Sequence, residues 1–306
     1  MGKNGGRVLE LRPNPTQEAF MVSEALENCL VGPRGEGKSD AGLMAMTYHA
    51  KQQEASARPV SWVMIRDTMV EHWAQTVKFI RDSRWRDFVK LIPDGPQPRA
   101  FAMPGYWHCE LVGVDQPQDL KKLRGVYGGV WAEEVAPVWD YGATSKGMPE
   151  DAWELALSGL RQKGVAPRAQ VTSNYPDDTH WMWRRYCTDP MKGTALFRIP
   201  QGENPYYTAK EREILLQRWQ NNPAMRARLV EGRPAFVPPG EEVTPEFDER
   251  FHVSPAPLDV LRGVQLDLCW DFGLTPVCLF TQTAPASGQW RIYDTVAGEN
   301  IGVRQL

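Results

Sequence analysis

Short apolar segments alternate with longer amphipathic segments over the first 230 residues. The apolar segments predict strands over 29–31, 60–65, 107–112, 126–132 and 169–172. Apolar residues at helical spacing predict helices over 14–27, 38–53, 68–80, 117–123 and 151–162, and further helical segments between 201 and 233. The four prolines of 93–104 indicate a loop or a strand edge. Strands that alternate with helices predict an α/β fold with a mostly parallel central sheet flanked by helices.

The pattern changes after residue 232. Six prolines lie between 233 and 257, which indicates an extended linker over 233–260. The apolar segments that follow are typical of a three-strand meander. We therefore predict one domain over 1–232, a linker over 233–260, and the start of a second domain over 261–306.

Composition and charge limit the classes of protein that this chain can be. Hydrophobic residues make up 42% and charged residues 24%, so the chain can form a packed soluble core. The net charge of −3 argues against one continuous basic DNA-binding surface, so any DNA contact would be local, transient or shared among subunits. Five widely spaced cysteines without a CxxC pair argue against a zinc site or a disulfide framework and fit a reducing cytoplasm. We expect no membrane segment and no signal peptide.

A complete phosphate-binding motif lies between the first predicted strand and the following helix. The segment GPRGEGKS matches G-x-x-x-x-G-K-[ST], and it consists of Gly32, Pro33, Arg34, Gly35, Glu36, Gly37, Lys38 and Ser39. Its glycines let the backbone wrap around phosphates, and the N–H groups at the helix start point at the anion. Lys38 can reach the β- and γ-phosphates, and Ser39 can ligate Mg²⁺. The motif therefore predicts an ATP site with Mg²⁺ as cofactor; the alternative is a chance match in a glycine-rich turn.

Two adjacent carboxylates end the predicted strand at 126–132. A motor ATPase needs one group that holds Mg²⁺ through water and one that polarises the attacking water. We assign the metal-side role to Glu133 and the role of catalytic base to Glu134. Most such strands carry Asp first, so Glu133 is a departure, and its longer side chain would shift the metal-linked water. The alternative is an ordinary solvated strand end.

The order of these segments resembles that of phage terminase large subunits, and the resemblance spans nearly the whole chain. The loop resembles the family's G-x-R-G-x-G-K-S form, in which Arg34 would contact the γ-phosphate; the alternative is a solvent-facing arginine. PTQEAF is similar to the family's adenine-side motif, which would place Gln17 near the base. LRG before the acidic strand would make Arg124 an arginine that acts on a neighbouring subunit's nucleotide. SNYP falls at the coupling motif, so Ser173 and Asn174 would sense the γ-phosphate; the alternative is an ordinary turn.

The C-terminal segments resemble the passage from the motor to a nuclease of the ribonuclease-H type. WDFG would supply Asp271 as the first metal-binding carboxylate, with Asp267 as the competing candidate, and Glu299 would be the second. Such nucleases need about three or four acidic groups around two Mg²⁺ or Mn²⁺ ions. We therefore expect no nuclease activity from this chain alone, and an endonuclease only in a longer form.

The resemblance implies a hydrolase of the bacteriophage DNA-packaging machinery, a motor that translocates double-stranded DNA into a procapsid. Its implied partners are duplex DNA, the portal protein, the small terminase subunit and further copies in a ring, with a monomer as the alternative for an isolated chain. It would act in the host cytoplasm, docked on the procapsid and absent from the mature virion. Basic clusters could contact DNA, although most such residues lie on solvated helix faces: Arg81/Arg84/Arg86/Lys90, Lys121/Lys122/Arg124, Arg161/Lys163/Arg168, Arg184/Arg185 and Arg226/Arg228/Arg233.

Two other readings of the sequence stay open. A helicase-like P-loop ATPase would share the loop and the acidic pair but would not need the WDFG segment. A nucleotide-switched DNA-binding or assembly protein would bind ATP with negligible turnover. A small-molecule kinase would use the same loop, but it leaves the C-terminal third unexplained.

Overall fold

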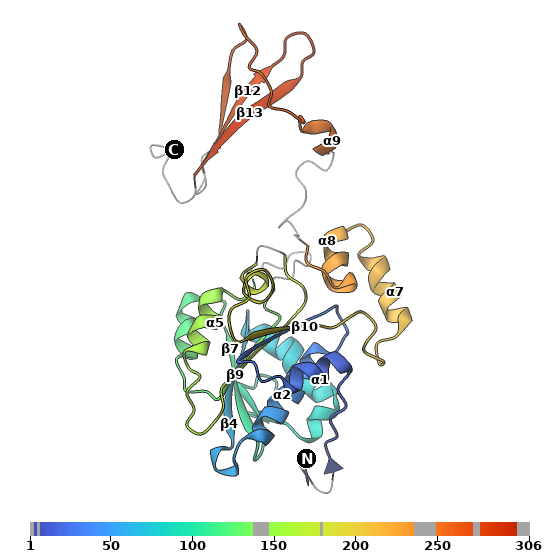
Figure 1. The fold of residues 1–306 in the computed structure, drawn as a ribbon, viewed down its shortest axis with the longest axis vertical. Coiled ribbons are helices and arrows are strands. Elements are labelled where there is room, and N and C mark those ends of the chain that lie inside the picture. Colours follow the sequence, from blue (N-terminus) through green and yellow to red (C-terminus); the bar gives the residue numbers. More distant parts are fainter. Residues whose placement is uncertain are drawn as a thin grey trace. The chain divides into compact units, whose positions relative to one another are not determined.

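The computed structural model describes residues 3–4, 7–136, 147–177, 180–235, 249–271 and 276–298. The chain divides into two compact units, Met1–Pro239 and Gly240–Leu306, and each is described by itself (Figure 1). The predicted domain limits at 232 and 261 stay predictions.

The first unit is built on an eight-stranded sheet. The strand order is β10-β3-β9-β8-β4-β7-β6-β5. The bounds are β3 (Glu27–Val31), β4 (Val60–Arg66), β5 (Lys90–Ile92), β6 (Ala100–Met103), β7 (Trp107–Gly113), β8 (Gly129–Glu133), β9 (Arg168–Ser173) and β10 (Thr194–Arg198). The six strands from β10 to β7 pair in parallel, whereas β6 and β5 pair antiparallel. The predicted α/β fold with a mostly parallel sheet is confirmed.

Helices and short turns of helix connect these strands. The longer ones are α1 (Pro15–Val22), α2 (Lys38–Gln52), α5 (Glu150–Leu157) and α7 (Ala209–Arg218). The shorter ones are η1 (Ala55–Ala57), α3 (Met69–Glu71), η2 (His72–Val77), α4 (Lys78–Asp82), η3 (Arg84–Asp87), η4 (Pro117–Leu123), α6 (Trp181–Trp183), η5 (Arg184–Thr188), α8 (Pro223–Arg226) and η6 (Ala227–Glu231). A short hairpin, β1 (Lys3–Asn4) with β2 (Arg7–Val8), precedes them. Within the described residues, every helix is too short or too polar to span a bilayer.

Two apolar clusters hold the helices on opposite faces of the sheet. Successive side chains of a strand point to opposite faces. Accordingly, Leu30 belongs to the cluster that includes α2 residues, whereas its neighbours Cys29 and Val31 belong to the cluster that includes α5 residues. Figure 1 shows α1 and α2 on one side of the sheet and α5 on the other. The central strands are buried on both faces, as their apolar sequences require.

The predicted ends of two helices are wrong. The helix predicted over 14–27 ends at Val22, and Glu27 opens β3 instead. The Glu27 carboxylate is buried and accepts two 2.8 Å hydrogen bonds from Arg185, an interaction that spacing along α1 cannot reveal. The helix predicted over 151–162 ends at Leu157. Strand β10 was not predicted at all, because its partly exposed edge position gives it a weak apolar pattern.

The second unit is a small antiparallel sheet. Its strands are β11 (Asp267–Asp271), β12 (Val277–Thr283) and β13 (Trp290–Ala297), in that order, and α9 (Glu249–His252) precedes them. The predicted three-strand meander is confirmed. Its assignment to a nuclease of the ribonuclease-H type stays a prediction.

Buried histidines make the stability of the first unit depend on pH. His49 of α2 donates from Nε2 to the Ala166 carbonyl at 2.7 Å and lies edge-on to Trp62. Burial lowers the pKa of His49 to about 4, against an opposing contribution from the hydrogen bond with Ala166. Burial likewise lowers the pKa of His72 to about 3. Because the folded pKa lies below the unfolded value, the unfolded chain takes up protons first, and stability falls as pH decreases from about 6.5 towards 4.

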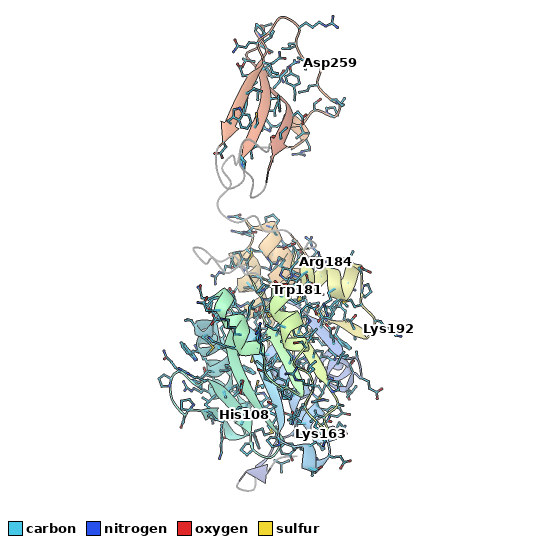
Figure 2. All side chains as sticks on the ribbon, turned by 90° about the vertical axis from the view of Figure 1, so that its left-hand side faces the viewer. His108, Lys163, Trp181, Arg184, Lys192 and Asp259 are labelled. Carbon is cyan, nitrogen blue, oxygen red and sulfur yellow. The ribbon has the colours of Figure 1, made fainter. Side chains whose placement is uncertain are left out.

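We expect the urea-unfolding free energy of wild type to fall between pH 7.5 and pH 5.5. His49→Gln should reduce that fall by about 1.4 kcal/mol, since it removes one histidine that only the unfolded chain protonates. His108→Gln, which changes a partly exposed histidine of β7 (Figure 2), is the matched control. An unchanged pH dependence in His49→Gln would show that His49 is protonated in the folded state.

Candidate nucleotide-binding site

The phosphate-loop motif connects β3 to α2. Gly35 and Gly37 have φ angles of +86° and +78°, a region that favours glycine. A Cβ atom on Gly35 would also lie 2.7 Å from the ring of Tyr207. Lys38 begins α2 directly after the loop, so the first N–H groups of a 15-residue helix open towards it. The predicted strand–loop–helix context is therefore present, and these N–H groups suit an anion.

The buried ammonium of Lys38 ties the loop to a neighbouring strand. Its Nζ donates to the carbonyls of Gly32 at 3.1 Å and Pro33 at 2.8 Å, and to Oδ1 of Asn174 at 2.9 Å. Burial lowers the pKa of Lys38, and the charge of Glu134 is the largest influence that opposes this. The cation therefore holds the loop in shape and lies where it can meet phosphate oxygens.

Asn174 connects Lys38 to the acidic pair. Its Nδ2 donates to Oε2 of Glu134 at 2.9 Å, so Asn174 lies between the lysine and the carboxylate. Glu134 has a φ of +53°, which is unusual for a residue with a side chain, and its N–H donates to the Thr172 carbonyl at 2.8 Å. Ser173 is buried and accepts a 3.1 Å hydrogen bond from the Ala136 N–H. The structure thus brings together Lys38, Asn174 and Glu134, whereas Ser173 contacts the backbone two residues beyond Glu134.

Glu133 is held by an arginine that the sequence analysis missed. Its Oε2 lies 2.8 Å from Nη1 of Arg66 and accepts from the Thr76 hydroxyl at 3.1 Å, and both ionic side chains are 2% exposed. Glu133 Oε1 is buried and has no hydrogen-bond partner among the described residues. Arg66 could have been noticed in the sequence as the charged residue that ends the apolar strand VSWVMIR. The burial of Arg66 is explained by its partner Glu133 at the end of β8, which the sequence of β4 does not reveal.

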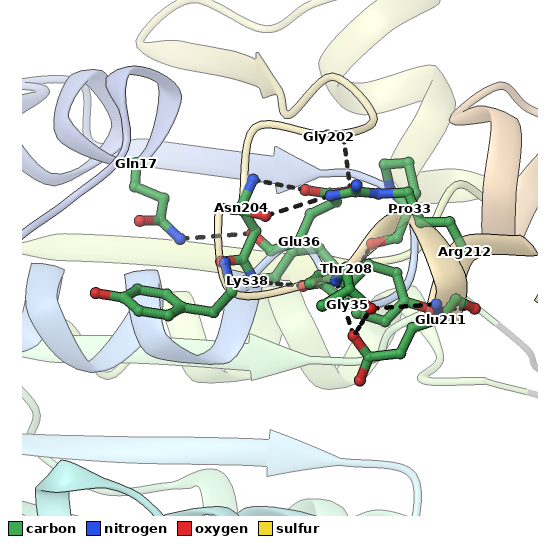
Figure 3. Close-up of polar contacts among 12 residues, drawn as sticks. Gln17, Pro33, Gly35, Glu36, Lys38, Gly202, Asn204, Thr208, Glu211 and Arg212 are labelled. Atoms are coloured by element: carbon green, nitrogen blue, oxygen red, sulfur yellow. Dashed lines mark hydrogen bonds and ion pairs between the residues drawn. The ribbon is translucent and has the colours of Figure 1, made fainter.

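The Glu36 side chain binds a neighbouring segment of the protein, although its position in the phosphate loop suggests contact with a nucleotide. Its side chain is fully buried and accepts from the N–H groups of Gly202 at 2.8 Å and Asn204 at 2.9 Å, while Arg212 Nε lies at 3.4 Å (Figure 3). Asn204 Nδ2 in turn donates to the Gly35 carbonyl at 2.6 Å. The carboxylate is used to fasten segment 202–212 to the loop, which leaves only the Glu36 backbone for a nucleotide.

Gln17 also braces the loop. Its Oε1 accepts from the Asn14 N–H at 2.9 Å. Its Nε2 donates to the Gly37 carbonyl at 3.0 Å, and Figure 3 shows this nitrogen directed at the loop. The side chain is buried. Gln17 therefore lies beside the loop and lines the cavity, its amide has partners at both ends, and its place near a base stays a prediction.

A cavity of about 1180 Å³ is lined by eight of the predicted site residues. It is lined by Gln17, Arg34, Gly35, Gly37, Lys38, Ser39, Glu134 and Asn174, among others. The Arg34 side chain is exposed there, which places it where a bound nucleotide could contact it. The cavity is large enough to hold a nucleotide.

The remaining predicted residues lie elsewhere. Glu133 and Ser173 are behind the cavity wall, and Arg124 is an exposed residue after η4 that does not line it. Asp271 lies exposed on β11 of the second unit, as does Asp267. Glu299 lies outside the described residues.

The donor set fits Mg²⁺ carried by a nucleotide. Ser39 and Glu134 both line the cavity. Across the described ranges no three His, Cys, Asp or Glu side chains cluster as a metal site. Mg²⁺ in phosphate sites usually takes one or two protein groups, with phosphate oxygens and water as the other ligands. Ser39 would hold the ion directly, whereas Glu133, which was predicted to hold it through water, pairs with Arg66 and does not line the cavity.

Several residues of the basic clusters are structural. Arg168 donates to the carbonyls of Phe20 and Ser23, Arg185 pairs with Glu27, and Arg228 donates to the Tyr175 carbonyl at 2.6 Å. All three are buried, so they are unavailable to DNA. Lys163 of these clusters is exposed instead, as is Lys192, which lies outside them (Figure 2).

Solved structures with the same fold were found by comparison with known proteins. No protein-family model matches the sequence, and no curated protein matches it. A structure of the large terminase from a thermophilic bacteriophage (crystal form 2) superposes with a TM-score of 0.57 at 15% identity, covering 94% of this chain and 69% of that one. Structures of the same terminase with ADP (TM-score 0.56) and with ATP-gamma-S (TM-score 0.53) each have 15% identity and cover 94% of this chain and 68% of theirs. The chain shares the fold of these large terminases, as its sequence predicted.

Arg66→Met should lower the free energy of unfolding by about 3–5 kcal/mol, because it leaves the buried Glu133 carboxylate without its cation. Adding Glu133→Gln should recover most of that loss, since a neutral amide can still accept from Thr76. Arg12→Met, which removes an exposed pair with Glu10, is the control and should change stability by less than about 0.5 kcal/mol. Urea denaturation at pH 7.5 measures all three. A double variant as unstable as the single one would trace the loss to packing around Arg66.

Proposed function

We propose that this chain binds ATP with Mg²⁺ and hydrolyses it. The observation that carries the proposal is the hydrogen-bonded series Lys38–Asn174–Glu134 at the wall of the cavity. It joins a phosphate-binding cation to a carboxylate that can act as a base, through an amide that contacts both. The shared fold supports the proposal, because the phage terminase structures that have this fold include complexes with ADP and ATP-gamma-S.

The residues divide the work between phosphate binding, metal binding and water activation. The loop N–H groups and Lys38 hold the phosphates, and Ser39 ligates the nucleotide's metal ion. Bound Mg²⁺ neutralises charge on the phosphate oxygens. Glu134 orients a water molecule in line with the γ-phosphate and accepts its proton. Asn174 exchanges its contact with Lys38 for one with the γ-phosphate, so that it registers whether that phosphate is present.

We further propose that hydrolysis drives double-stranded DNA into a procapsid. In this proposal the chain works in a ring docked on a portal protein and meets DNA with the help of a small subunit. Arg34 acts on the nucleotide of its own subunit. Arg124, exposed and away from its own cavity, acts on that of a neighbour. Scattered exposed lysines and arginines suit DNA contacts that form and break in each cycle.

The test is ATP hydrolysis by purified protein over a concentration series, with and without duplex DNA. Lys38→Ala and Glu134→Gln should each lower turnover by about 10²-fold or more, because they remove the phosphate contact and the base. Lys210→Ala and Glu213→Gln make the same exchanges on the exposed face of α7 and should leave turnover unchanged. Turnover per subunit should rise with protein concentration, since Arg124 acts between subunits.

Each part of the proposal can fail separately. Turnover that survives Glu134→Gln would remove Glu134 as the base. ATP binding that depends on Lys38 but gives no turnover at any concentration would favour the nucleotide-switch reading. Turnover per subunit that is independent of concentration would exclude a catalytic role between subunits for Arg124.

A further inference from the structure

Tyr206 is an exposed aromatic residue in the wall of the nucleotide cavity. Its side chain is 84% exposed, the highest value among the large hydrophobic residues of the described chain. The neighbouring Tyr207 behaves in the opposite way: its ring packs against Gly35, and Arg212 lies 5.2 Å from its centroid. One tyrosine therefore supports the loop from behind, and the other faces open space beside it.

The segment that carries Tyr206 is fixed to the phosphate loop. Asn204 Oδ1 accepts from the Tyr206 N–H at 3.1 Å, while Asn204 Nδ2 donates to the Gly35 carbonyl. Glu36 holds the same segment through the N–H groups of Gly202 and Asn204 (Figure 3). Because these bonds begin at the residues that wrap the phosphates, the backbone of Tyr206 has a set position relative to them.

Two polar side chains that line the same cavity already have partners within the protein. Gln17 uses both ends of its amide within the protein. Arg12, which also lines the cavity, is paired with Glu10 at 2.7 Å. An open aromatic face suits a nucleobase, because stacking is favourable for any base.

We propose that Tyr206 stacks on the base of the bound nucleotide. The proposal rests on the nucleotide binding proposed above and adds a residue to it. Asn204 and Glu36 are positioning residues, because their hydrogen bonds tie the backbone of Tyr206 to the phosphate loop. Recognition by stacking implies that the base contributes affinity while its identity is read only weakly.

The experiment compares a ligand that has a base with one that has none. A fluorescent ATP analogue is bound to the full chain with Mg²⁺ and displaced by ATP or by inorganic tripolyphosphate. Tyr206→Ala should weaken ATP binding about tenfold, by loss of stacking, and leave tripolyphosphate binding unchanged. Tyr206→Phe should bind both as wild type does. Phe251→Ala, an exposed aromatic residue of the second unit, is the matched control.

The outcomes separate this proposal from the one on which it rests. If wild type binds ATP, Lys38→Ala abolishes that binding and Tyr206→Ala binds ATP like wild type, the stacking role is overturned and the nucleotide site stands. Equal weakening of ATP and tripolyphosphate in Tyr206→Ala would also overturn it, since the phosphate end would then be disturbed. If wild type binds neither ligand, both proposals fail. Thermal melting confirms that each variant is folded.

Discussion

Lys38 and Glu134 come from segments that lie almost one hundred residues apart in the chain, and Asn174 donates to one and accepts from the other. This contact depends on the parallel pairing of β3, β9 and β8, which brings the carboxyl ends of three strands to one edge. In that register Val31 lies beside Ser173, and Glu133 beside Thr172. A register shift of one residue would turn Asn174 to the other face of the sheet and separate the cation from the carboxylate. The apolar residues that fix the register therefore also determine the geometry of the site.

Three buried carboxylates, each paired with a distant arginine, attach the surrounding segments to this sheet. Glu27 holds η5 through Arg185, Glu36 holds α7 through Arg212, and Glu133 holds Arg66 of β4. Although burial alone would raise it, hydrogen bonds from Arg185 and Trp153 keep the pKa of Glu27 below its ordinary value. Buried pairs of this kind add little net stability compared with apolar packing, but a missing partner is costly. The three pairs act mainly on geometry, because each determines which segment packs at a given strand end.

The sequence predicted the parts of the site that depend on local pattern. GPRGEGKS requires only a preceding strand and a following helix, and both are visible as apolar periodicity. The acidic pair was placed correctly at a strand end for the same reason. Arg66 and Tyr206 were missed, and Glu36 was predicted only as a loop residue, because their roles depend on partners 67 or more residues away or on a surface that the fold creates. Likewise, Arg168, Arg185 and Arg228 look like solvated charges in the sequence, and only tertiary contacts show that they are buried.

The backbone at Glu134 helps to distinguish hydrolysis from simple binding. A φ of +53° costs a residue with a side chain about 1–2 kcal/mol, so the surrounding structure must compensate for it. The bond from the Glu134 N–H to the Thr172 carbonyl holds this conformation, and the result is a carboxylate that lines the cavity while Glu133 points behind it. A protein that only binds ATP gains nothing from this arrangement, since a negative charge near the γ-phosphate weakens nucleotide binding. A catalytic base, in contrast, must lie in the cavity next to the attacking water, and this backbone conformation puts the Glu134 carboxylate in the cavity wall. The strained residue therefore favours turnover over a nucleotide switch.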